Sequence, residues 1–226
     1  MDYSKNIRYF TGISFKGPIW LIIISVVLAI AGFATGGPGI VVGILGIGGV
    51  VGSVFMIISK KKKASTDAAY DAAVMSQLDG LKEKALRKLG IDEDEVKEIA
   101  PITFGGYKYS GIDYIKLGAD NRWRTNKYES AILFFSEHEV HCYSYNFDTT
   151  KAQFTESTEV YFYQDIVSAS TASESVNALN NNINYEVFKL TTKGGTSLTV
   201  SLFDTDGSAQ RSINAMRSLL KAKKQG

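Results

Sequence analysis

The two histidines of this chain stand close together, in the segment His138-Glu-Val-His141-Cys142. Imidazole nitrogen and thiolate sulfur are the ligands that zinc prefers, so this spacing suggests a metal site. On a β-strand, however, residues three apart point to opposite faces, and the two imidazoles would not converge on one ion. We therefore predict no metal site here, with His138 in a turn and Cys142 as a small residue of the core.

Four consecutive acidic residues, from Asp92 to Glu95, suggest a calcium loop. A helix-loop-helix calcium site starting at Asp92 would need glycine at its sixth position and glutamate at its twelfth, where Lys97 and Thr103 stand. Negative charge also suits the N-terminus of a helix. We therefore expect Asp92 to cap a short helix that ends at Pro101, with Glu95 completing a capping box.

The rest of the chain shows no spacing that is typical of catalysis. No glycine-rich loop opens a helix to hold a phosphate, and no Gly-x-Ser-x-Gly motif presents a nucleophile. We therefore expect no catalytic residue, no cofactor and no enzymatic activity. The single cysteine rules out an internal disulfide framework. Residues 64–226 are net acidic, which argues against a nucleic-acid partner.

The most informative segment carries no charge at all, from Gly17 to Ser59. A single helix of that length would measure roughly 64 Å, about twice the hydrocarbon thickness of a bilayer. Its middle contains the helix breakers Thr35-Gly-Gly-Pro-Gly39. We therefore predict a hairpin of two transmembrane helices, from about Pro18 to Ala34 and from about Ile40 to Ile58.

Glycines recur four residues apart in and around these predicted spans. Small residues at this spacing let helix backbones approach closely in lipid. We expect them to pack the two spans together, to join subunits in a homo-oligomer, or both, although glycine is also common in membrane helices in general. The predicted packing residues are Gly32, Gly36, Gly39, Gly43, Gly48 and Gly52.

Basic residues flank the hairpin on both sides. Lysines occupy all four positions from Lys60 to Lys63, where they are expected to contact anionic lipid headgroups. The positive-inside rule then puts both termini in the cytoplasm, with the hairpin in the plasma membrane. The alternative is a secretory signal peptide cleaved near Leu28-Ala-Ile-Ala31, which would leave one span.

A helical connector is predicted after the lysines. Residues from Ser65 to Leu89 lack proline and carry an apolar stripe at a spacing of three and four residues. Gly90 is expected to end this helix. The stripe predicts either packing on the following domain or a coiled coil between subunits.

From Ile102 onward, β-branched and aromatic residues alternate with polar ones, as in strands. Lys193-Gly-Gly-Thr196 predicts a tight hairpin turn with positive φ at both glycines. A long loop from about Ser168 to Asn184 is expected to be disordered or to bind a partner. An amphipathic helix should follow Asp206. The predicted strands span 102–109, 112–117, 128–135, 139–146, 158–164, 185–192 and 197–203.

This order of elements resembles the pleckstrin-homology-like (PH-like) domains of bacterial membrane proteins. The stretch Ala131-Ile-Leu-Phe-Phe-Ser-Glu-His-Glu-Val140 is similar to their central hairpin, and Tyr161-Phe-Tyr-Gln-Asp-Ile166 to the next strand and its exit. The resemblance covers residues 100–224 and implies a binding or assembly module. It also implies that basic residues near the first hairpin contact an anionic partner, unless that loop is simply solvated. The corresponding residues are Arg122, Trp123, Arg124 and Lys127.

The expected fold is therefore α+β. A cytoplasmic segment (1–16) precedes the transmembrane hairpin (17–59), a basic and helical connector (60–100) and a PH-like bent antiparallel sheet of about seven strands with a C-terminal helix (101–226). The whole layout resembles two-span membrane proteins of Gram-positive bacteria. We predict a non-enzymatic membrane scaffold or binding module that self-associates and binds lipid or a protein partner. An oligomeric pore and a peripheral sensor of anionic lipid are the alternatives.

Overall fold

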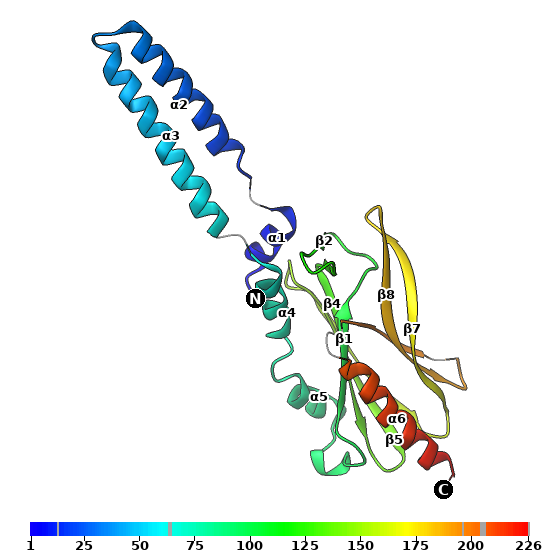
Figure 1. The fold of residues 1–226 in the computed structure, drawn as a ribbon. Coiled ribbons are helices and arrows are strands. Elements are labelled where there is room, and N and C mark those ends of the chain that lie inside the picture. The colour runs from blue at the N-terminus through cyan, green and yellow to red at the C-terminus, as the bar shows by residue number, and fades with distance from the viewer. Residues whose placement is uncertain (13, 63–64, 196, 204–206, 226) are drawn as a thin grey trace. The chain divides into compact units, whose positions relative to one another are not determined.

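A computed structural model of the chain describes residues 1–12, 14–62, 65–195, 197–203 and 207–225. Two compact units emerge, one formed by Ile7–Thr66 and the other by Met1–Asn6 together with Asp67–Gly226. The helices are α1 (Tyr3–Thr11), α2 (Lys16–Thr35), α3 (Gly39–Lys62), α4 (Asp67–Met75), α5 (Leu81–Leu89) and α6 (Ser208–Gln225), with a short 3-10 helix at Glu93–Glu95 (Figure 1).

Helices α2 and α3 form the predicted hairpin. Their mean hydropathies are 2.4 and 2.5, and both are long and apolar enough to cross a membrane. The helices extend beyond the predicted limits, because charged residues at their ends continue the helical backbone. Between them, Gly36 and Gly37 adopt φ values of +61° and +49°, which L-residues with a side chain rarely adopt.

The connector differs from the single helix predicted over Ser65–Leu89, and that prediction is wrong. The chain leaves helical geometry after Met75 and resumes it at Leu81, where Gly80 adopts a left-handed φ of +70°. Gly90 ends α5 as expected, with its N–H bonded to the carbonyl of Leu86. The predicted capping box is also wrong, because Asp92 makes no capping hydrogen bond to the short 3-10 helix.

The strands are more numerous than the seven predicted. They are β1 (Ile102–Tyr107), β2 (Ile115–Leu117), β3 (Trp123–Thr125), β4 (Lys127–Phe135), β5 (Glu139–Asp148), β6 (Phe154–Phe162), β7 (Ile166–Ala178), β8 (Asn181–Thr192) and β9 (Ser197–Leu202). All pairings are antiparallel. The orders are β1-β4-β5-β6 in a four-stranded sheet, β7-β8-β9 in a three-stranded sheet, and β2-β3 in a separate ribbon.

The largest error concerns the loop predicted from Ser168 to Asn184. This segment is the long β7–β8 hairpin, closed by Leu179 and Asn180 at positive φ (Figure 1). Its polar residues resemble a loop in composition, but they pair across the two strands. Ser175 donates to the side chain of Asn184, for example, at 2.6 Å. The Gly-Gly turn joins β8 to β9 as expected, with positive φ at Gly195 alone, while Thr196 lies outside the described residues.

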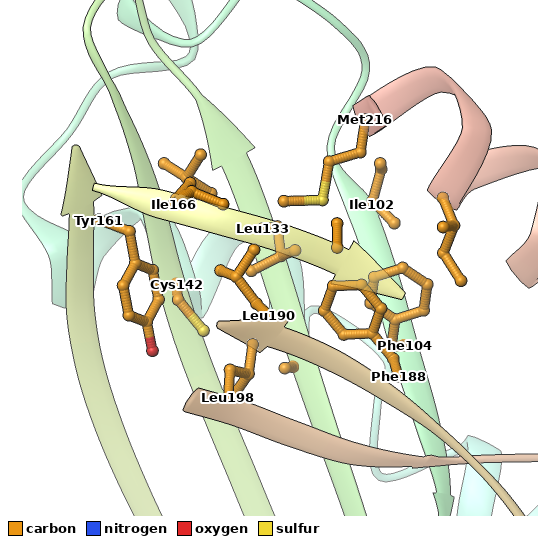
Figure 2. Packing of buried hydrophobic residues seen from close by; sticks show 14 of the residues in the cluster. Ile102, Phe104, Leu133, Cys142, Tyr161, Ile166, Phe188, Leu190, Leu198 and Met216 are labelled. Atoms are coloured by element: carbon orange, nitrogen blue, oxygen red, sulfur yellow. The ribbon is translucent and has the colours of Figure 1, made fainter. Parts of the chain in front are cut away.

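The main core lies between the two larger sheets and α6 (Figure 2). The rings of Phe104 and Phe188 stack with centroids 4.1 Å apart and join the four-stranded to the three-stranded sheet. From α6, the apolar side chains of Ile213, Met216 and Leu220 enter this core. A polar surface thus lies on one side of α6 and an apolar one on the other, as the sequence predicts for this helix.

Helix α5 covers the opposite, outer face of the four-stranded sheet. Leu81 and Ala85 pack on Ile132, Phe134 and Tyr143 in a second cluster. The apolar stripe of the connector therefore packs on the domain, which decides between the two alternatives left open by its sequence.

Candidate functional site: two membrane legs and a lysine-lined groove

The two spans approach each other most closely at small residues. A β-carbon at Gly46 would lie 2.6 Å from both the carbonyl oxygen of Ser25 and the amide nitrogen of Ala29. One at Gly32 would lie 2.6 Å from the carbonyl oxygen of Gly39. Because these neighbours are backbone atoms, any larger residue would push α2 and α3 apart.

The six glycines predicted to pack helices fall into three groups. Gly32, Gly39 and Gly43 lie at the contact between α2 and α3 or at its turn end, and Gly36 forms the turn itself. A β-carbon at Gly48 or Gly52 would meet no atom within 4 Å. Gly46 and Gly49 also lie at the contact between α2 and α3 and were not among the predicted residues, although their spacing of three residues from Gly43 and from each other is a signal for it.

The basic segment after α3 is described only in part. The ammonium of Lys60 donates to the carbonyl oxygen of Ser14, 3.2 Å away. Lys61 and Lys62 belong to α3, but their side chains lie outside the described part of the structure, as does Lys63 entirely.

The chain segments before and after the hairpin meet on one residue of the β domain, Thr149. The side-chain amide of Asn6 donates to its carbonyl oxygen at 2.8 Å. From α4, the hydroxyl of Tyr70 lies 2.7 Å from the Thr149 hydroxyl and donates to the carbonyl oxygen of Thr125, also at 2.7 Å. Asn6 and Tyr70 are both buried, so water does not compete for these bonds. We call these two segments the membrane legs.

A buried arginine fixes the second leg. The guanidinium of Arg124 donates to both carboxylate oxygens of Asp71 in α4, at 2.8 and 2.7 Å, and to both of Asp120, at 2.8 Å each. The hydroxyl of Tyr107 adds a bond of 2.6 Å to Asp71. Hydrogen bonding to Arg124 lowers the pKa of Asp120 far below its usual value. Gly118 is required here, since a β-carbon would lie 2.6 Å from an Asp120 oxygen.

This geometry corrects part of the predicted anionic contact. Arg124 is only 2% exposed, and its charge is matched by two carboxylates, so it is not available to a partner. Arg122 and Trp123 are half-buried, and the Arg122 guanidinium stacks 5.4 Å from the ring centroid of Phe203. Lys127, by contrast, lines a groove.

That groove has a volume of about 470 Å³. It is lined by residues of β4, β5 and β6, by the turn between β5 and β6, and by Lys108, which follows β1. Leu133 of β4 and Cys142 of β5, for example, face the core. Because side chains alternate along a strand, Lys127 and Asn146 lie on this same face, at the other end of the two strands. The polar residues that line the groove are Lys108, Lys127, Asn146, Asp148, Gln153 and Thr155.

The carboxylates near the groove are already engaged inside the protein. Asp148 accepts bonds from Asn126, at 2.9 Å, and from the amide and hydroxyl of Thr150, at 2.8 and 2.6 Å. Glu129 accepts two bonds from Ser201, and Lys108 stands 3.8 Å from its other oxygen. Within the described residues, Lys127 forms no ion pair. The groove therefore presents the ammonium of Lys127 together with amide and hydroxyl groups, beside the hydrogen-bonded carboxylate of Asp148. An ammonium with neighbouring hydrogen-bond donors suits a ligand with an anionic group.

The histidines lie as their spacing predicts. His138 is 81% exposed in the turn before β5, whereas His141 lies within β5 with its imidazole 3.3 Å from a carboxylate oxygen of Glu139. Cys142 is a buried core residue, as expected. Among the residues that the structure describes, no three His, Cys, Asp or Glu side chains gather in a way that could hold a metal ion.

Comparison of the chain with protein-family models, with curated proteins and with solved structures gives no match.

Proposed function

We propose that this protein is a non-enzymatic, membrane-anchored scaffold and binding module. Its glycine-rich hairpin spans the plasma membrane with both termini in the cytoplasm, and its β domain binds ligands or partners at the membrane surface. The observation that carries this proposal is the junction at Thr149, where both membrane legs are hydrogen-bonded to the β domain. Hydrogen bonds on both connecting segments are expected of a domain that is held to its anchor, and not of a domain joined to it by a single flexible linker.

The length of the tether supports the same function. Only residues 63–66 separate the end of α3 from the start of α4. Five residue steps span at most about 18 Å even when the chain is fully extended. The leg that begins at Asp67 is therefore tethered to the end of α3 by a connection no longer than this.

The topology supports a PH-like domain in this role. A meander of three strands, β4-β5-β6, pairs with β1 in one sheet, a second meander, β7-β8-β9, forms another, and a C-terminal helix enters the core between them. This is the order of elements expected of such domains, with β2-β3 as an additional ribbon. PH-like domains are typically binding or assembly modules.

We assign self-association to the outward face of α3. Gly48 and Gly52 are four residues apart and have open space at their β-carbon positions, so a second hairpin could approach there closely. The test is the mass of the full-length protein in mild detergent. The double variant Gly48→Ile, Gly52→Ile should lose the oligomer. Val42→Phe, Val54→Phe, exposed on the same helix but on other sides of it than Gly48 and Gly52, should keep it.

A monomeric wild-type protein in that experiment would overturn the self-association. Equal loss of the oligomer in both double variants would overturn the assignment to the glycines, because added bulk anywhere on α3 would then suffice.

We assign ligand binding to the groove around Lys127. Two sources could supply the anionic group, a lipid headgroup or a free phosphate, and they can be separated. The melting temperature of the full-length protein is measured in phosphatidylcholine nanodiscs, with and without inorganic phosphate, and in nanodiscs that also contain phosphatidylserine. Stabilisation by phosphate indicates a soluble anion, and stabilisation by phosphatidylserine alone indicates a headgroup.

Lys127→Glu should abolish whichever stabilisation is found. The matched control is Lys193→Glu, an exposed lysine in the β8–β9 turn that does not line the groove. If neither anion stabilises the wild-type protein, or if both variants behave alike, the groove does not bind an anionic group.

A further inference from the structure

Strand β6 is the end strand of the four-stranded sheet, with β5 on one side only. We infer that this edge pairs with the β6 strand of a second copy of the protein, antiparallel and centred on Thr158. The contact would lie in the β domain and involve none of the hairpin glycines. It therefore goes beyond the self-association proposed for α3.

The hydrogen-bonding pattern shows which backbone groups of β6 point outward. Tyr163 donates its N–H to the carbonyl of His138 at 3.2 Å, and Asp148 donates to the carbonyl of Gln153 at 2.9 Å. These bonds identify the odd-numbered residues as the ones that bond to β5. In an antiparallel ladder the intervening residues then direct their N–H and C=O groups away from the partner strand. Residues 154, 156, 158 and 160 thus present these groups at the free edge.

The side chains along this edge are unusually apolar for an exposed strand. Phe154, Val160 and Phe162 are 60%, 48% and 49% exposed, respectively. A groove of about 560 Å³ runs beside Val160 and Phe162, with the turn from Thr192 to Gly194 as its other wall. The edge therefore offers backbone partners, apolar side chains and room for an added strand. These are the elements of β-strand addition.

Of the two carboxylates on β6, Glu156 is paired with lysines and Glu159 is hydrogen-bonded within one copy. Glu156 pairs with Lys84 at 2.7 Å and with Lys88 at 3.2 Å, and Glu159 accepts a bond from the hydroxyl of Tyr161. Exposed edges are commonly protected from pairing by lysine or proline. Strand β6 contains neither of these residue types.

The sequence of β6 is compatible with pairing to itself. The register that uses all nine residues is centred on Thr158 and sets Phe154 opposite Phe162 of the second copy. It also sets Glu159 opposite Ser157. Registers centred on Glu156 or Glu159 would set two carboxylates directly opposite each other, which is unfavourable. Charge and apolar pairing thus favour the same register. If both copies are anchored in one membrane, as the proposed function has it, their effective concentration for this contact is also raised.

Disulfide trapping tests this register in the full-length protein in membranes. Directly opposite residues that exchange hydrogen bonds have Cα atoms about 5.5 Å apart, which a disulfide can bridge. Thr158→Cys should therefore give a covalent dimer on mild oxidation. The matched control is Thr155→Cys, exposed on the same strand but opposite Tyr161 in this register, so that its two copies lie roughly 20 Å apart. It should stay monomeric.

A charge test needs no added cysteine. Thr158→Lys sets two ammonium groups opposite each other and should weaken dimerisation roughly threefold or more. Ser157→Lys adds the same charge one residue away but opposite Glu159, and should not weaken it. Both positions are exposed, so folding should be unaffected.

The trapping is repeated with Gly48→Ile, Gly52→Ile to separate the two contacts. A Thr158→Cys dimer that persists in this background supports an independent contact in the β domain. The inference is overturned if Thr158→Cys and Thr155→Cys cross-link equally, if neither cross-links, or if Thr158→Cys joins a different protein.

Discussion

The side-chain amide of Asn6 donates a hydrogen bond of 2.8 Å to the carbonyl oxygen of Thr149, 143 positions further along the chain. The first six residues therefore belong with the β domain, and the hairpin is an insertion between two parts of that domain. A helical hairpin inserted in this way has two covalent connections to the domain, and the structure provides hydrogen bonds on both of them.

Asn6→Ala tests the first membrane leg. The change leaves the carbonyl oxygen of fully buried Thr149 without its donor, which should lower the free energy of unfolding of the β domain by about 1–3 kcal/mol. Hydrogen exchange of the full-length protein in detergent should show faster exchange at Met1–Asn6 and around Thr149. Lys5→Ala, at an exposed position, is the control. Identical exchange in the two variants would show that Asn6 does not hold this leg.

Arg124→Met tests the second leg. The variant leaves the carboxylates of Asp71 and Asp120 without their shared cation. Because water reaches both carboxylates, the loss should stay below the roughly 3–5 kcal/mol that leaving a fully buried charge unpaired costs. Thermal unfolding should show a large loss of stability. Arg122→Met, two residues away and half-buried over Phe203, should cost much less. Equal losses in both variants would contradict the central role of Arg124.

The pair of Glu156 with Lys84 and Lys88 predicts an acid-sensitive part of the stability. Hydrogen bonding to Lys84 lowers the pKa of Glu156 from its usual 4.5 to about 2. Because the folded-state pKa is the lower one, this contribution is fully present above pH 4.5 and is lost as the pH falls towards 2. The melting temperature should therefore fall less steeply over this range in Glu156→Gln than in the wild-type protein.

Lys84→Met should flatten the same part of the profile, since it removes the main cause of the lowered pKa. If both variants show the same dependence of melting temperature on pH as the wild-type protein between pH 4.5 and 2, this pair does not contribute to the acid-sensitive stability.

Burial predicts that Cys142 is unreactive in the folded protein. Desolvation raises the pKa of its thiol to about 12, so very little thiolate forms at pH 8. A maleimide should label the native protein slowly and the unfolded protein fully. Thr155→Cys, whose added thiol is exposed, should gain one rapidly labelled site. Rapid labelling of the native wild-type protein would contradict the packing of β5 against the core.

Several features of the fold could be predicted because they depend on local pattern. The charge-free run and its central Gly-Gly-Pro-Gly segment predict two helices and a turn, since length and helix breakers alone limit the alternatives. Alternation in β9 and the apolar face of α6 likewise identify a strand and a helix. The β7–β8 hairpin was not predictable in this way, because serine and asparagine favour loops unless a neighbouring strand pairs with them.

The sequence by itself determined two long apolar helices joined by a turn and the connector's apolar stripe, because hydropathy and periodicity act within one element. The tertiary structure alone decided which glycines lie between the spans and which face outward, since that depends on how one helix is rotated towards the other. It also decided that Arg124 is buried and bonds α4 to the β domain, whereas Lys127 lines the groove. Arg124 and Lys127 are both cations in the same short segment. Their roles differ because the fold brings Asp71, 53 residues before Arg124, next to Arg124.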